Sequence, residues 1–419
     1  MMKAANKKAL VFITCLLMLQ ACSSGSTVTP YDGADYLARA QTQEQDGIRV
    51  TAGVPDRRET RAIFNTDLYK KRVQPVWLEI TNASDQPVTF LPVGLDPGYF
   101  SPTEAANLDL KLVPGGKSSP SMDINFFRQS LDTSLEPGET QKGFIFSALD
   151  EGTKAFNVDI VGDGMLSTFT FFIPVPGLHV DHYNVDWGNI YAADDYRNLD
   201  DEDLRAYLEA QTCCTTDKTA KGDGDPVNLV VIGHPLDVYA AFIRAGWDES
   251  ETITGSTTWK TMRSFIGGGE YRYSPVSGLY VFGRPQDVAF QKGRSNIHER
   301  NHLRLWLTPV TYNGVPVWMG QISRDIGVRF TKKTVTTHKI DPDTDETREF
   351  LLENLAYAQA LKKFGYVEGA IPAPIDETRG NFTGDPYFTD GYRVVLWVTS
   401  TPVNIMDIKF VNWRVPPGL

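Results

Sequence analysis

The chain has 419 residues, of which 41% are hydrophobic and 22% are charged, and this composition is typical of a globular protein rather than a disordered one. Its formal net charge of -11 at pH 7 disfavours nucleic acid and anionic membrane surfaces as general partners. A chain of this length suggests two or three domains.

The N-terminus has the layout of an export signal. Lysines precede an apolar run over residues 9–19, which is too short for a membrane-spanning helix because such a helix needs about 20 apolar residues. Residues 19–22 then read LQAC, which resembles the bacterial lipobox, where the cysteine is diacylated and the signal is cut before it. We therefore predict a lipoprotein signal peptide over residues 1–22, with Cys22 as the lipidated residue.

The residues after the predicted cleavage point indicate where the protein resides. By the same resemblance, Ser23 and Ser24, with no aspartate after Cys22, imply the outer membrane rather than retention at the inner one. Each buried CH₂ of an acyl chain adds about 0.8 kcal/mol, so several chains make a nearly permanent anchor. We expect a lipid-anchored outer-membrane protein that faces the periplasm, with residues 23–45 as a polar tether.

Residues 46–176 show the pattern of short antiparallel strands. Apolar residues alternate over residues 76–80, a turn cluster follows at residues 82–85, and a second run covers residues 88–91, which predicts a hairpin. A further strand pair is expected on either side of residues 162–164, which read GDG. Short strands at this spacing predict an immunoglobulin-like β-sandwich domain, a kind of module that usually binds or scaffolds.

Residues 177–225 form a predicted connector that is rich in aspartate and ends in a run of Gly, Asp and Lys. It contains two adjacent cysteines, Cys213 and Cys214, which cannot be assumed free in an oxidising periplasm. A disulfide between neighbouring residues is strained and uncommon. We therefore favour a packed turn with two small apolar side chains over a redox or metal-binding role.

A second domain is predicted over residues 226–400, followed by a C-terminal tail over residues 401–419. Its patterns alternate unevenly between strand and helix, which predicts a mixed-sheet α/β domain. The expected fold class of the whole chain is therefore α+β. The expected strands cover residues 227–233, 278–282, 303–307, 315–322, 334–338 and 392–398, and the expected helices cover residues 235–245 and 343–364.

The stretch from His298 to His302 spells the H-E-x-x-H pattern of zinc metalloproteases. That chemistry requires both histidines on one helix, with the glutamate as the base. Here Leu303, Leu305 and Leu307 alternate with polar and aromatic residues, which is the period of a strand. We therefore expect an extended chain from His302 onward and no metalloprotease site.

The same alternation places His302, Arg304 and Trp306 on one face of the expected strand. This face either points to solvent, as in an exposed antiparallel strand, or lines a ligand cleft. Asp325 and His338 lie at the ends of two further expected strands. They become neighbours of His302 if these strands pair.

A second candidate cluster precedes the expected long helix. Asp341, Asp343 and Asp345 alternate in the run DPDTDE, but the following residues lack the glycine and the final glutamate of an EF-hand loop. Asp343 with Glu346 fits a capping box, and acidic residues favour a helix N-terminus because of its dipole. The alternative is an acid–base or metal-binding cluster of Asp341 with His338.

Several strings of the C-terminal half carry a family resemblance: CCTT, GDPVNLVVIG, NHLRLWLTPV, PVWMGQISRDIGV, THKIDPDTDETREFLLENL and GDPYFTDGYRVVLWV. Through these strings, residues from about 213 to 400 resemble the LssY C-terminal domain family. In that family the domain also occurs fused to DedA-type and lipid-phosphatase-like membrane modules, which implies an envelope setting. The resemblance brings no established activity and assigns no catalytic residue.

Two functions fit these features. The first is a binding or accessory protein of the envelope, in which Arg304 and Trp306 contact an envelope lipid or protein. The second is a metal-assisted hydrolase that acts on a phosphorylated or lipidic envelope substrate. Its catalytic residues would be His302, His338, Asp341 and Asp325. No metal ligand is assigned, no cofactor is identified, and whether the chain is an enzyme stays open.

Overall fold

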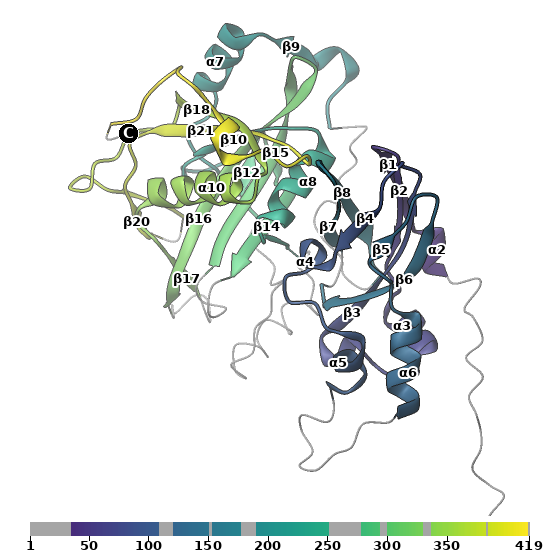
Figure 1. Cartoon of the computed structure of the whole chain (residues 1–419). Coiled ribbons are helices and arrows are strands. Elements are labelled where there is room, and N and C mark those ends of the chain that lie inside the picture. The colour runs from purple at the N-terminus through teal and green to yellow at the C-terminus, as the bar shows by residue number, and fades with distance from the viewer. Residues whose placement is uncertain are drawn as a thin grey trace, which may run out of the picture. The chain divides into compact units, whose positions relative to one another are not determined.

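The computed structural model describes residues 35–108, 120–150, 153–176, 190–250, 278–293, 300–329, 337–382 and 384–417. The predicted signal peptide, with Cys22, and the first part of the tether lie outside these residues. The described helices and strands form a mixed α+β fold, so the predicted fold class is confirmed (Figure 1). Among the described helices, none has the length and apolar character needed to cross a membrane.

Two antiparallel sheets form the N-terminal part of the structure. One has the strand order β1-β2-β3-β6 and the other has the order β5-β4-β7-β8. Inward-facing side chains of both sheets, such as Leu78 of β3 and Val158 of β7, pack in one hydrophobic cluster, as in a β-sandwich. The strands are β1 Gln41–Gln45, β2 Ile48–Gly53, β3 Val73–Asn82, β4 Val88–Leu91, β5 Ser134–Leu135, β6 Thr140–Ala148, β7 Thr153–Gly162 and β8 Met165–Pro174.

The predicted hairpin between residues 76–80 and 88–91 is wrong. β3 pairs with β2 and β6, whereas β4 pairs with β5 and β7 in the other sheet. The turn carries the chain from one sheet to the other, and Asn82 stabilises it by donating from Nδ2 to the backbone oxygen of Gln86 at 2.8 Å. The predicted strand pair around residues 162–164 is confirmed as β7 and β8.

Short helices precede these strands or lie between them in the sequence. α3 begins after Asp56, whose carboxylate accepts the N–H of Glu59 while the Glu59 carboxylate accepts the N–H of Asp56, which is a capping box. At the other end, Phe64 packs edge-on against Phe144 and Phe146 of β6. The helices are α2 Asp35–Ala38, α3 Arg57–Phe64, η1 Tyr69–Lys71, α4 Pro92–Leu95, α5 Pro102–Ala106 and α6 Pro120–Gln129.

A ten-stranded mixed sheet forms the C-terminal part of the structure. Its main path is β11-β14-β15-β16-β10-β21-β18-β22, with β17 paired to β16 and β9 paired to β15. β10 runs parallel to β21 and antiparallel to β16. β9 comes from the predicted connector, so the connector contributes a strand to this sheet. The strands are β9 Arg197–Leu199, β10 Leu229–Ile232, β11 Asp248–Glu249, β14 Val288–Gly293, β15 Arg300–Tyr312, β16 Val315–Arg329, β17 Thr337–Ile340, β18 Leu361–Glu368, β21 Tyr392–Val398 and β22 Lys409–Val411.

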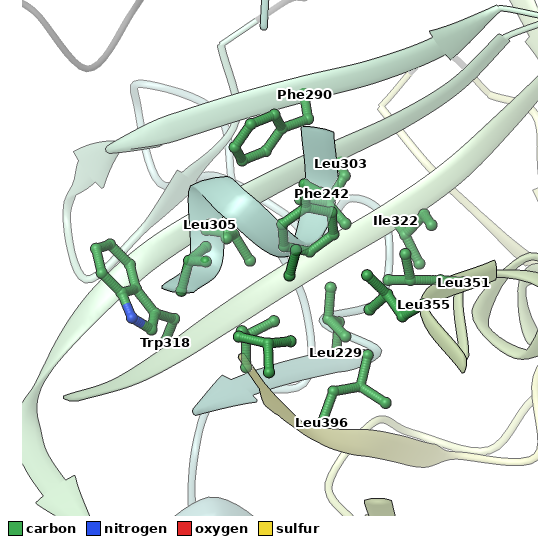
Figure 2. Close-up of a cluster of buried hydrophobic side chains, with 14 of the residues drawn as sticks. Leu229, Phe242, Phe290, Leu303, Leu305, Trp318, Ile322, Leu351, Leu355 and Leu396 are labelled. Carbon is green, nitrogen blue, oxygen red and sulfur yellow. The ribbon is translucent and has the colours of Figure 1, made fainter. Parts of the chain in front are cut away.

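Both faces of the central strands of this sheet are buried. Alternate residues of β10 and β21 join two different hydrophobic clusters, one shared with α8 and α10 and the other shared with α7. Figure 2 shows the first cluster, in which Leu303 and Leu305 of β15 lie with Phe242 of α8 and Leu351 of α10. The remaining elements are η4 Ala193–Asp195, α7 Asp201–Glu209, α8 Pro235–Arg244, β12 Tyr280–Val281, β13 Arg284–Pro285, α10 Thr344–Tyr357, β19 Arg379–Gly380, β20 Pro386–Tyr387 and η5 Ile405–Asp407.

The long helix predicted over residues 343–364 ends earlier than expected. α10 ends at Tyr357, Gln359 takes a positive φ of 58°, and β18 follows. The residues after Tyr357 have good helix propensity, but pairing with β21 outweighs it. The predicted start is confirmed, because the Asp343 carboxylate accepts the N–H of Glu346 at 3.0 Å.

The predicted domain boundaries, at residues 176 and 226, stay a prediction.

Candidate functional site

The strand expected from His302 onward is confirmed, because β15 runs extended over Arg300–Tyr312. The leucines among residues 303–307 lie in the cluster shared with α8 and α10. Side chains alternate along a strand, so His302, Arg304 and Trp306 face the other side of the sheet. The helix that a zinc metalloprotease requires is therefore replaced by a strand at His302.

The face of β15 that carries these side chains is buried. His302 is 6% exposed and Arg304 is 5% exposed, so the alternative of a solvent-facing strand is wrong. The neighbouring strand β16 extends the same face, since Gln321 lies opposite Arg304 and Ser323 lies opposite His302. We call the buried polar side chains of this face the polar cluster: Gln291, Arg300, His302, Arg304, Gln321, Ser323 and Asp325.

His302 and Asp325 are in direct contact within the polar cluster. His302 Nε2 lies 2.7 Å from Asp325 Oδ2. If the Asp325 carboxylate is ionised it can only accept a hydrogen bond, and Nε2 is then the donor. Burial lowers the pKa of His302 to about 4, although the neighbouring Asp325 acts in the opposite direction. The imidazole is therefore neutral at pH 7.

Two arginines on β15 complete the positive side of the cluster. Arg300 Nη1 donates to Gln291 Oε1 at 2.9 Å, and Arg304 Nη1 donates to Gln321 Oε1 at 2.8 Å. Arg300 Nη2 approaches Asp325 Oδ2 only to 4.0 Å, and burial lowers the pKa of Arg300. Arg300 Nε and Gln321 Nε2 are buried, and no hydrogen-bond acceptor for them lies among the residues that the structure describes.

A second carboxylate approaches the polar cluster from a distant part of the chain. Asp225 is 9% exposed and accepts a hydrogen bond from Asn381 Nδ2 at 3.0 Å. Burial raises the pKa of Asp225, while Asn381 and Arg304 oppose that rise and Asp325 adds to it. The charges of Arg304 and Asp325 are thus close enough to act on Asp225.

Asp341 takes part in a turn. Its backbone N–H donates to the Arg324 oxygen at 2.8 Å, and its carboxylate accepts the N–H of Asp343 at 3.1 Å. His338 lies in β17, opposite Val328 of β16, and its side chain is outside the described part of the chain. The catalytic roles of Asp341 and His338 stay predictions. His302 and Asp325 lie next to each other, as expected for paired strands.

Trp306 lies at the apolar end of the same face. It packs in the cluster shared with α7 and donates from Nε1 to the Arg284 oxygen at 3.3 Å. These contacts make Trp306 part of the core, and its predicted role in ligand binding stays untested. His298 and Glu299, the other residues of the H-E-x-x-H pattern, lie outside the described residues, as does Cys22.

The structure adds residues to the site that the sequence interpretation did not include. Arg300 lies two positions before His302, and Gln321 lies in the next strand, so both could have been found by extending the alternation. Asp225 could not be found in this way, because it is distant from β15 in the sequence and only the fold brings it close.

The adjacent cysteines are linked in the structure. A disulfide joins Cys213 and Cys214, so the favoured interpretation of two unlinked, merely packed side chains is wrong. The linked pair lies at the start of a hairpin, where Cys214 forms an antiparallel bridge with Pro226.

Fold and site together define an α+β protein whose C-terminal mixed sheet encloses a buried cluster of arginine, histidine and aspartate. Residues 205–392 match the family model described as LssY C-terminus. This part of the chain therefore belongs to that family, as the sequence strings indicated. The match includes β15, β16 and the whole polar cluster. A search of curated proteins found no match to the chain.

Proposed function

We propose that the chain is a lipid-anchored envelope protein whose LssY C-terminus domain binds an anionic group at the polar cluster. The observation that carries this proposal is the burial of Arg300 and Arg304 on one sheet face beside the neutral His302. A buried guanidinium attracts an anion strongly because little water competes for it. The expected ligand group is a phosphate or carboxylate of an envelope lipid or protein.

The hydrogen bonds of the cluster leave donors for such a group. The 4.0 Å contact of Arg300 with Asp325 is longer than a charge-assisted hydrogen bond, which measures about 2.7–2.9 Å. Arg300 Nε and Gln321 Nε2 are buried without an acceptor among the described residues. Buried donors usually have a partner, and an oxyanion supplies acceptors for both.

Anion binding is tested by thermal unfolding of the full chain in detergent. Inorganic phosphate should raise the unfolding temperature above that in chloride at equal ionic strength. A ligand at a hundred times its Kd stabilises the folded state by about 2.7 kcal/mol. Arg300→Gln should abolish the phosphate-dependent rise, because it removes a buried positive charge while keeping a polar side chain.

Arg324→Gln is the matched control. Arg324 lies in β16 and donates to Asn301 Oδ1 at 3.0 Å, and its guanidinium lies 5.3 Å from the Phe350 ring of α10, on the opposite side of the sheet. This variant should keep the full response to phosphate. An equal response of wild type and Arg300→Gln, or no response of the wild type, contradicts the proposed binding.

The envelope location is proposed from the first residues of the chain. Expressed in a bacterium that makes lipoproteins, the full chain should be found with the outer membrane and carry acyl chains on Cys22. Cys22→Ser should remove the acyl mass and release the protein from the membrane, because the acyl chains supply the apolar surface that holds it there. Wild-type protein that is found in the soluble fraction and carries no acyl chain on Cys22 contradicts the proposed anchor.

A hydrolase is the second candidate, and the contact between His302 and Asp325 favours it. Asp325 fixes the orientation of an imidazole that is neutral at pH 7, as a general base requires. The metal-assisted form needs further ligands, and the metal-ligand group found among the described residues does not include His302. Turnover of a phosphate ester that falls about 100-fold or more in His302→Gln supports this candidate. Equal turnover of the ester by the wild type and by His302→Gln rules out the hydrolase.

A further inference from the structure

The disulfide lies at the base of a hairpin that the backbone holds closed. The N–H of Val227 donates to the Cys213 oxygen at 2.8 Å, and the N–H of Thr215 donates to the Asp225 oxygen at 2.9 Å. The N–H of Gly224 returns a bond to the Thr215 oxygen at 2.7 Å. These bonds do not depend on the sulfur atoms, so the two sides of the hairpin remain opposite each other when the disulfide is broken.

Other segments of the chain contact both sides of this hairpin. Arg393 of β21 is fully buried and donates to backbone oxygens that precede the cysteines, including those of Gln211 and Thr212. On the other side, Gly224 packs so closely that a Cβ there would lie 2.2 Å from Phe382 Cε2. The segment around the cysteines is therefore held by contacts with other parts of the fold.

Three metal-ligating side chains meet at this point. The two cysteine sulfurs and a carboxylate oxygen of Asp223 all lie within 4.8 Å of one another. Cys214 is buried, Cys213 is half-buried and Asp223 is exposed. Solvent, a reductant and a metal ion can therefore approach from the side of Cys213 and Asp223.

Asp223 is available to change partners. Its carboxylate is paired with Arg379 Nη2 at 3.2 Å, and the two side chains are 51% and 34% exposed. Ion pairs in contact with water contribute little to stability. Moving the carboxylate from Arg379 to a divalent cation therefore costs the fold little.

We propose that reduction of the Cys213–Cys214 disulfide creates a binding site for a soft divalent cation, with both thiolates and the Asp223 carboxylate as ligands. A dithiol reductant supplies two electrons and two protons, the S–S bond breaks, and the reductant closes its own disulfide. The two thiols then lose their protons to solvent as they bind the cation. Three protein ligands leave one position for water in the tetrahedral geometry of Zn²⁺.

This site is controlled by the redox state, because the oxidised sulfurs are bonded to each other and are not thiolates. Its three ligands are not members of the polar cluster, so it does not rest on the proposed anion site. Asp225, which approaches the polar cluster, is two residues from Asp223 in the same hairpin.

The test is a Cd²⁺ titration of the full chain in detergent, followed by the ultraviolet absorption of the metal–thiolate bond. The protein is reduced with a dithiol, which is removed before the metal is added. The reduced wild type should bind one Cd²⁺ per chain more than Cys213→Ser and Cys214→Ser, and the oxidised wild type should show no thiolate absorption. Asp223→Asn should weaken binding about tenfold or more.

Asp217→Asn is the control within the same hairpin. The Asp217 carboxylate accepts the N–H and the hydroxyl of Thr219, and Asp217 is not a member of the ligand group. This variant should bind Cd²⁺ like the wild type. Equal Cd²⁺ binding by reduced wild type and Cys213→Ser overturns the proposal, and so does undiminished affinity in Asp223→Asn.

Discussion

Burial controls the protonation of His302. Its pKa is about 4 in the folded chain, compared with an ordinary value of 6.5. The Asp325 carboxylate at 2.7 Å favours the charged imidazole, but the loss of water outweighs this effect. A neutral imidazole can accept a proton or hydrogen-bond a ligand, and it adds no positive charge to that of the two arginines.

This pKa predicts how stability depends on pH. Between pH 6.5 and about 4 the unfolded chain binds a proton at His302 that the folded chain does not bind. The free energy of unfolding should therefore fall as the pH drops through this window, by about 3 kcal/mol in total. Urea unfolding at several pH values measures this loss.

Two variants isolate the contribution of His302. His302→Gln should flatten the part of the pH dependence between pH 6.5 and 4, because the titrating group is gone. His234→Gln, at an exposed position before α8, is the control for removing a histidine outside the polar cluster. If the free energy of unfolding changes equally with pH in the wild type and in His302→Gln, His302 is not held neutral by burial.

The elements of the C-terminal sheet show what alternation can and cannot predict. The alternating leucines identified β15 and the two sides of the strand, because this information is local. The pattern does not say whether the polar side is covered. Burial of that side involves residues that are distant in the sequence, such as Asp225, which lies close enough for the charges of Arg304 and Asp325 to act on it.

Strand partners and element ends are equally hard to derive from local patterns. β3 and β4 alternate correctly and are separated by turn residues, yet they pair in different sheets. The end of α10 was missed because the residues after it suit a helix, and only the pairing of β18 with β21 makes them a strand. The start of α10 was predictable because the capping residue is adjacent in the sequence.

The N-cap of α10 gives a prediction at the scale of one element. Asp343→Ala should lower the free energy of unfolding by about 1 kcal/mol, because the N–H of Glu346 loses its acceptor. Glu353→Ala, at an exposed position in the middle of the same helix, should change it by less than about 0.5 kcal/mol. Denaturant unfolding compares the two, and equal effects contradict the capping role.

At the scale of the whole molecule, the proposed roles fall in different segments. The polar cluster and the cysteine hairpin both lie within residues 205–392, the part that matches the LssY C-terminus family. The sheets of the sandwich lie before that match. We propose that ligand binding belongs to the part that matches the LssY C-terminus family, and that the sandwich and the predicted anchor at Cys22 position this part in the envelope.

The most direct test of an anion site is the pKa of His302, measured by NMR with and without inorganic phosphate. The His302→Gln variant identifies the imidazole signal. An anion held by Arg300 and Arg304 stabilises the charged imidazole, so phosphate should raise the pKa of His302 above about 4. A His302 pKa that is the same in phosphate and in chloride contradicts binding of an anion at the polar cluster.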